Sequence, residues 1–377
     1  LFAPAYGLVG PAGVMLQNLT LAIAGLYCLY RLAGRLGGER VARIASVLYV
    51  LLPASIFHPQ AFVSEGITNP LLIVATYILA FGFGSDRARP GKLALAGLLL
   101  AVVGFVRPVL VLFPVAAATL VVLRGSGAAR MRWRDAVVLA VLGLPLPLGA
   151  VLTERLLADR YPAGESVGGL GSNLYLRARR MAAIGGVALP DGMVANPRRK
   201  GSGPRSIAPS DFVELIAERP LDYARTVLSD ALNLVANPGV AMVAGRYFGL
   251  FDLGEHTHTD LDKWREVRER DGMLAMLAEL WRTSPAGLTA LLAGALLWGA
   301  LLIVALYGAI RLLRERTVAL GLRLWLLGLP LCLGGLTSLL AGYARWDHRS
   351  PVEFVLAILV AFAFAERGRP TGDRGAP

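Results

Sequence analysis

Long apolar stretches recur along most of this chain and are separated by short turns. A helix needs about 20 mainly apolar residues to cross the hydrocarbon of a bilayer. Hydrophobic residues make up 55% of the 377 residues, and the mean hydropathy is +0.58. An ordinary soluble domain is only about 45–50% apolar, even with glycine counted. We therefore expect an all-α polytopic membrane protein.

The apolar stretches predict about nine membrane spans in two blocks. They cover residues 14–32, 41–57, 67–84, 93–106, 109–123, 136–152, 286–310, 319–341 and 351–365. A polar segment of about 130 residues follows the sixth span, which is too long for a linker and long enough to fold. The expected organisation is an N-terminal transmembrane block at 1–152, a loop domain at 153–285, a second transmembrane block at 286–366 and a tail at 367–377.

The loop domain is expected to be mainly helical. Asp211 and Glu214 have the spacing of a capping box, which predicts an amphipathic helix continuing towards Asn233. Residues 260–282 predict a second, charge-rich helix.

Arginine clusters occupy alternate turns and predict the orientation. They fall at residues 31–43, 87–92, 124–134, 311–323 and 367–374. Basic turns of multipass proteins face the cytoplasm, so the C-terminus is expected there and the loop 153–285 outside, in a plasma membrane. The positive residues behind the net charge of +12 lie mostly in these clusters. We therefore expect the chain to interact with a bilayer and not with a nucleic acid.

The count of spans has a further consequence. Nine spans with a cytoplasmic C-terminus place Leu1 outside the cell. Since the chain opens without a signal peptide, we expect one more helix, with the loop after it, upstream of Leu1.

Glu65 stands at residues 58–66, a short polar break between two spans with no lysine or arginine. A carboxylate at the edge of the membrane is costly to keep, which suggests a function. The alternative is an acid at the start of a helix, which complements the helix dipole. Arg107 joins two spans on the same expected side. Its guanidinium could bind a phosphate with two hydrogen bonds, or reach lipid headgroups from the interface.

The densest polar cluster in the membrane part precedes the last span. It contains Tyr343, Arg345, Asp347, His348, Arg349 and Glu353. Such a set could hold a phosphate or diphosphate leaving group, and the alternative is an ordinary belt of interfacial aromatic and charged residues. His256 and His258 have a loose metal-ligand spacing, but a helix-capping loop with Thr259 or Asp260 as N-cap is the better interpretation. The sequence predicts no metal site.

Four short motifs resemble those of the C-type polytopic glycosyltransferases. This family includes the protein O-mannosyltransferases, the lipid A aminoarabinose transferases and the rhizobial-type lipopolysaccharide-core transferases. The similar segments are GERVAR at 38–43 with Pro53, SE at 64–65 with Leu71 and Leu72, AGLL at 96–99 with FVRP at 105–108, and YARWDHRSP at 343–351. They span the membrane part but not the loop.

The resemblance implies transfer of a sugar from a polyprenyl-phosphate donor to a lipid, glycan or protein acceptor on the extracytoplasmic face. Arg107, Tyr343, Arg345, His348 and Arg349 would bind the donor phosphate. Glu65 would be a supporting acid, or would hold a divalent metal if the reaction uses one. The family's principal catalytic aspartate lies in the first external loop, which we expect upstream of Leu1. Two alternatives stay open: a transporter or flippase of a lipid-linked or anionic substrate, and a non-catalytic relative.

Overall fold

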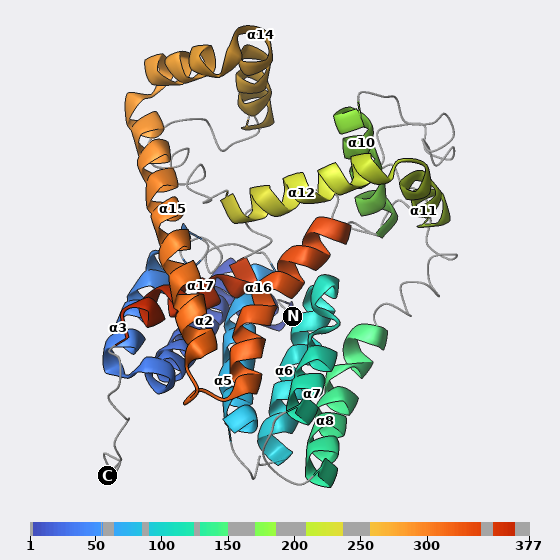
Figure 1. Ribbon diagram of the computed structural model, residues 1–377, viewed down its shortest axis with the longest axis vertical. Helices are drawn as coiled ribbons and strands as arrows, with labels where there is room; N and C mark the ends of the chain where they lie inside the picture. Colours follow the sequence, from blue (N-terminus) through green and yellow to red (C-terminus); the bar gives the residue numbers. More distant parts are fainter. Residues whose placement is uncertain are drawn as a thin grey trace.

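The computed structural model describes residues 3–53, 55, 64–84, 90–123, 129–149, 170–185, 209–236, 257–340 and 350–365. Every regular element in these ranges is a helix (Figure 1). The helices of the N-terminal part are α1 (Ala3–Val9), α2 (Pro11–Gly37), α3 (Glu39–Leu51), α5 (Glu65–Gly84), α6 (Pro90–Val106), the 3₁₀ turn η2 (Pro108–Leu110), α7 (Phe113–Leu123) and α8 (Ala129–Gly143). Those that follow are α10 (Leu170–Gly185), α11 (Pro209–Glu218), α12 (Pro220–Ala236), α14 (Thr257–Thr283), α15 (Pro285–Arg314), α16 (Leu320–Leu340) and α17 (Glu353–Ala363).

Three of these helices are long and apolar enough to cross a membrane. They are Pro11–Gly37, Pro285–Arg314 and Leu320–Leu339. On α15, Leu296, Ile303 and Leu306 are 77%, 73% and 65% exposed. A contiguous apolar surface of this kind is not stable in water, so the chain associates with a membrane.

Several expected spans are shorter in the structure than the sequence predicts. The predicted span 41–57 contains a helix that ends at Leu51, and the predicted span 109–123 is divided into η2 and α7. The last one, α17, is 11 residues long. At about 1.5 Å per residue it reaches roughly 16 Å, half the hydrocarbon thickness.

Two helices of the polar segment are interrupted. The helix predicted from Asp211 towards Asn233 begins earlier, at Pro209, and breaks before Pro220. A proline lacks the N–H that a helix interior needs, which explains the break. In α14 the break is at Gly272, whose φ of 86° lies in the left-handed region that favours glycine.

Basic side chains gather at one end of the bundle, which we call the arginine-rich end. Arg35 of α2 and Lys92 of α6 stack on the ring of Phe81 in α5, at 3.4 and 3.9 Å from its centroid. Arg311 of α15 donates to the carbonyls of Ala363 and Ala365 at the end of α17. In the same way Arg323 donates to the Leu313 carbonyl, and Arg132 donates to the Val122 carbonyl. Guanidinium groups thus satisfy the last carbonyls of α17, α15 and α7.

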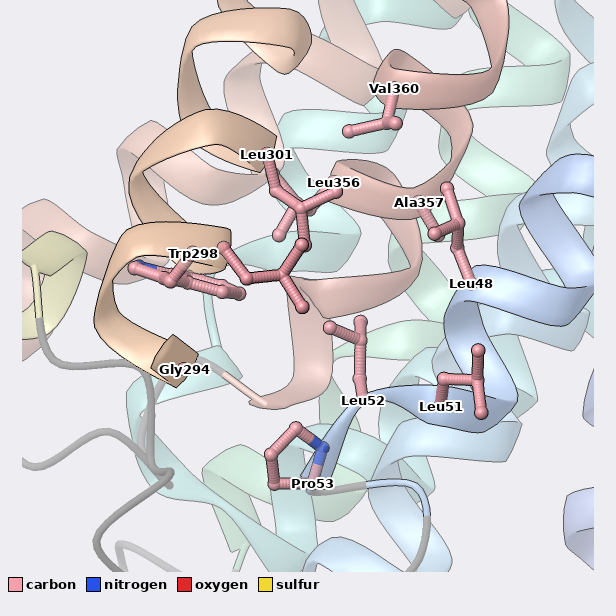
Figure 2. Close-up of a pocket in the computed structure, with 11 residues that line it drawn as sticks. Leu48, Leu51, Leu52, Pro53, Gly294, Trp298, Leu301, Leu356, Ala357 and Val360 are labelled. Carbon is pink, nitrogen blue, oxygen red and sulfur yellow. The ribbon is translucent and has the colours of Figure 1, made fainter. Parts of the chain in front are cut away.

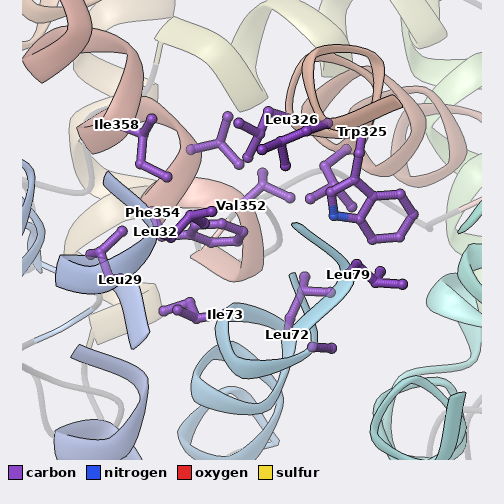
Figure 3. Packing of buried hydrophobic residues seen from close by; sticks show 14 of the residues in the cluster. Leu29, Leu32, Leu72, Ile73, Leu79, Trp325, Leu326, Val352, Phe354 and Ile358 are labelled. Carbon is purple, nitrogen blue, oxygen red and sulfur yellow. The ribbon is translucent and has the colours of Figure 1, made fainter. Parts of the chain in front are cut away.

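A single apolar core connects α2, α5, α16 and α17 (Figure 3). Trp325 of α16 is buried in this core and donates from its indole N–H to Thr76 Oγ1 of α5 at 3.1 Å. The rings of Phe83 and Phe113 pack against this indole. Where α15 meets α17 the two backbones are so close that a Cβ on Gly308 would collide with the Leu359 carbonyl. Small residues permit such close packing between apolar helices.

Candidate functional site

Glu65 and Arg107, both predicted as site residues, form an ion pair in the structure. Arg107 Nη2 lies 2.7 Å from Glu65 Oε1. Glu65 begins α5 and Arg107 follows the last residue of α6. Since Phe81 and Lys92 mark the other ends of α5 and α6 at the arginine-rich end, the pair lies at the opposite end of both helices.

The start of α5 fixes the carboxylate. Ser64 Oγ donates to Glu65 Oε2 at 3.0 Å, and the Ser64 carbonyl accepts from the Thr68 N–H and hydroxyl. Glu65 therefore stands in the first turn, where the helix dipole favours a negative charge. The helix-terminal and the functional interpretations of Glu65 thus describe the same position.

The two side chains of the pair are mostly buried but remain partly accessible. The side chains of Arg107 and Glu65 are 12% and 10% exposed. Arg107 Nη1 is buried and has no hydrogen-bond partner among the described residues. A buried guanidinium N–H without an acceptor is costly, so this atom would gain from an anionic ligand.

Further polar side chains are buried beside Glu65, and the sequence interpretation missed them. Thr68 and Asn69 are 0% and 5% exposed. Relative to Glu65 they stand at i+3 and i+4, and therefore on its helix face. Polar residues repeating at this spacing in an apolar run are the signal that could have found them.

A second buried ion cluster joins the polar segment to the membrane helices. Arg177 of α10, which is fully buried, and Arg180 both pair with Asp230 of α12. Arg177 Nη2 also donates to the carbonyls of Ser338 at 2.5 Å and Thr337 at 3.5 Å, in the last turn of α16.

Tyr223 of α12 adds a further link by donating to the Leu339 carbonyl at 3.1 Å. Burial raises the pKa of the Tyr223 phenol, which keeps it a neutral donor. Burial likewise lowers the pKa of Arg177, against the opposing effect of Asp230. The last carbonyls of α16 are thus capped by side chains from α10 and α12.

The predicted cluster at 343–349 lies outside the described residues, and with it all four of its proposed donor-binding residues, Tyr343, Arg345, His348 and Arg349. The structure describes both of its flanks. Leu340 ends α16 next to the Tyr223 contact, while Ser350 and Glu353 are buried at the start of α17. These four donor-site residues therefore stay predictions.

The histidine pair gains no support from the described part. His256 lies outside it, whereas residues 258–260 belong to α14, which begins at Thr257. Thr259 and Asp260 are therefore inside the helix and not its N-cap. Among the described residues no group of three or more His, Cys, Asp and Glu side chains is placed to hold a metal ion.

The end of α5 and α6 opposite the arginine-rich end therefore combines three features. They are the oriented carboxylate of Glu65, the Arg107 guanidinium whose Nη1 has no acceptor among the described residues, and a buried polar helix face. Such a set can bind a phosphate beside a hydroxyl-bearing group. Comparison with protein-family models, with curated proteins and with solved structures found no match.

Proposed function

We propose that this chain is a membrane glycosyltransferase that moves a sugar from a polyprenyl-phosphate donor to an extracytoplasmic acceptor. The acceptor would be a lipid, a glycan or a protein. The observation that carries the proposal is the Glu65–Arg107 pair, in which Arg107 Nη1 remains without an acceptor among the described residues. The motif resemblance at 64–65 and 105–108 led independently to the same two residues.

The proposed topology has about nine membrane segments in the plasma membrane. By the positive-inside rule the arginine-rich end is cytoplasmic. The Glu65–Arg107 pair and the helices α10, α11, α12 and α14 then belong to the extracytoplasmic side, where lipid-linked sugars are used. Figure 1 supports this arrangement, since these helices lie at the top while the turn between α15 and α16 lies in the lower half.

In the proposed reaction an acceptor hydroxyl attacks the anomeric carbon of the sugar. The new glycosidic bond forms as the bond from this carbon to the phosphate oxygen breaks, and the lipid phosphate leaves with the electron pair. A carboxylate takes the hydroxyl proton. Arg107 would hold the leaving phosphate through Nη1 while Glu65 fixes its guanidinium through Nη2. Arg345 and Arg349 would add positive charge.

This assignment refines the role of Glu65. A carboxylate whose Oε1 faces a guanidinium at 2.7 Å and whose Oε2 accepts from Ser64 is oriented by both. It is therefore suited to orienting Arg107 and a sugar hydroxyl, as a supporting acid rather than the principal base.

A transporter is the main competing function. Transporters of lipid-linked substrates commonly bind them at discontinuous helices near mid-membrane. Within the described residues α5 and α16 continue through Pro70 and Pro330. This continuity favours the enzyme.

The decisive experiment reconstitutes the protein in vesicles and supplies a panel of radiolabelled polyprenyl-phosphate sugars. We expect label to appear on an acceptor, together with free polyprenyl phosphate, and Arg107→Ala to lower the rate of both about 100-fold. Movement of intact donor across the bilayer without product would instead establish the transporter. No dependence on Arg107 in either assay would overturn the proposed site.

A further inference from the structure

An apolar pocket of about 290 Å³ lies between α3, α15 and α17 (Figure 2). From α15 it is lined by Gly294, Leu297, Trp298 and Leu301, which share one helix face at i, i+3, i+4 and i+7. The lining residues from α3, from the two positions after it and from α17 are all leucine, proline, alanine or valine. Among the described lining side chains, the only polar group is the indole N–H of Trp298, which already donates to the Val235 carbonyl of α12 at 2.8 Å.

The pocket results from unequal helix lengths. The 30 residues of α15 extend about 45 Å, whereas the 11 residues of α17 extend about 16 Å. Because Arg311 ties the end of α17 to the arginine-rich end, α17 cannot cover the far half of α15. Gly294 lies about 30 Å along α15 from Arg314, in that far half, and Leu301 lies about 20 Å from Arg314, near the middle of the helix.

The pocket opens sideways onto the apolar surface of the protein. Leu51 and Leu297 line it and are nevertheless 66% and 63% exposed, and the adjacent Leu296 is 77% exposed. Leu296 and Leu297 belong to the exposed apolar face of α15, a helix long and apolar enough to cross a membrane. With α15 in the bilayer, the pocket is accessible from the hydrocarbon.

The chemistry of the lining restricts the occupant. An apolar cavity of about half this volume stays dry and takes up benzene, so water does not fill the pocket. A peptide strand would bring backbone N–H and C=O groups with no partners. A helix of a second copy is about 10 Å wide and does not fit. A flexible hydrocarbon chain satisfies the size, the lining and the lateral opening.

We propose that this pocket binds one acyl chain of a membrane glycerophospholipid. The chain enters between Leu51 and Leu297 and packs against the Trp298 indole. The Trp298–Val235 hydrogen bond closes the pocket towards α12 and leaves the headgroup beside that helix. This site is separate from the proposed transfer reaction and does not depend on it.

The test uses Trp298 as a contact probe. The full chain is reconstituted in vesicles of phosphatidylglycerol and phosphatidylethanolamine with brominated or unbrominated acyl chains, because bromine quenches tryptophan on contact. The signal of Trp298 is the difference between the protein and its Trp298→Phe variant, since the chain has six tryptophans. Although Trp298 is only 5% exposed, we expect it to be quenched.

Variants locate the quenching. Ala357→Leu fills the pocket and should lower the Trp298 quenching at least about twofold, because a close-packed interior excludes the chain. Gly294→Leu is a second filling variant should the first not fold. Leu296→Phe enlarges a lipid-facing residue of the same helix and should leave the quenching unchanged.

Three results would overturn the proposal. The first is no quenching of Trp298 by brominated lipid. The second is unchanged Trp298 quenching in the filling variants. The third is loss of the quenching when polyprenyl phosphate is added in an amount equimolar to the protein. The last result would assign the pocket to an isoprenoid chain instead. Because none of these measurements reads sugar transfer, their failure is distinct from failure of the proposed function.

Discussion

Within the described part of the chain, two buried arginine–carboxylate sites differ in which N–H groups of the arginine have an acceptor. At Arg177 both Nη atoms have acceptors: Asp230 for one, and the Thr337 and Ser338 carbonyls for the other. The Arg177 and Asp230 side chains are 0% exposed. At Arg107, Nη2 pairs with Glu65 whereas Nη1 has no acceptor among the described residues, and the pair is slightly exposed.

We interpret the difference as one between a structural contact and the proposed binding site. The Arg177 site has two arginines and one aspartate, and its excess positive charge faces the negative end of the α16 dipole. It holds α10 and α12 against α16 through both Nη atoms of Arg177, while the buried Arg177 Nε has no hydrogen-bond partner among the described residues. The Glu65–Arg107 site is neutral as a pair and incomplete in hydrogen bonds, so a ligand can complete it.

The largest expected effect is the loss of Asp230. Asp230→Ala leaves Arg177 buried and Arg180 beside it without their carboxylate, which should cost about 3–5 kcal/mol of stability. The readout is the melting temperature of the detergent-solubilised protein. Arg225→Ala, which removes an exposed pair with Asp222 at 3.6 Å, is the matched control and should cost less than about 1 kcal/mol. Equal effects of the two variants would mean that the Arg177 cluster does not hold α12 in place.

Arg107→Ala should lower sugar transfer about 100-fold, because a donor to the departing phosphate is lost. Initial rates with the labelled donor measure this effect. A double variant, Glu65→Arg with Arg107→Glu, exchanges the two charges and preserves an ion pair. It distinguishes a structural role of the pair from a role in binding the phosphate. If the pair is only structural, the exchanged protein will transfer sugar at the original rate. We expect it to fold and to stay inactive.

Glu65→Gln should reduce transfer at least about tenfold while expression is retained, because the neutral amide orients Arg107 more weakly. Donor dependence of the rate distinguishes loss of binding from loss of turnover. Unchanged turnover would remove Glu65 from the site. Thr20→Val is a suitable control and should leave transfer unchanged, since the Thr20 hydroxyl donates to the Leu16 carbonyl of its own helix.

The smallest effect concerns Tyr223. Tyr223→Phe removes the hydrogen bond to Leu339 and should cost about 1 kcal/mol. The raised pKa of Tyr223 also gives a pH signature. The stabilising contribution of the phenol is complete below its unfolded pKa of about 10 and is lost as the pH rises through the folded value. Melting temperatures of the two proteins should therefore diverge at neutral pH and converge in strong alkali. A constant difference would contradict the burial of this phenol.

Local sequence signals predicted much of the helix pattern but not the helix lengths. Pro285 and Ser284 begin α15 where the apolar run begins, and the Ser284 hydroxyl accepts from the Gly287 N–H as an N-cap should. In contrast, hydropathy predicted residues 41–57 as one span, because apolar character alone does not tell where a helix stops. Pro220 stands within the helix predicted from Asp211 towards Asn233, and the structure has the break directly before this proline.

For the site, the sequence identified Glu65 and Arg107 individually, since a charge at the membrane edge stands out in an apolar chain. It could not predict that they pair. It also gave no sign of Arg177, because an arginine in a polar segment is normally exposed.

What the sequence determined by itself is the membrane character, the helical class and the side of the bundle on which basic residues gather. These follow from hydropathy and charge, which add up residue by residue along the chain. The tertiary structure alone decided which charges meet, which helix ends they cap and where α15 stays uncovered. Those properties depend on which helices become neighbours, and residues such as Arg177 and Ser338 meet only after the chain has packed.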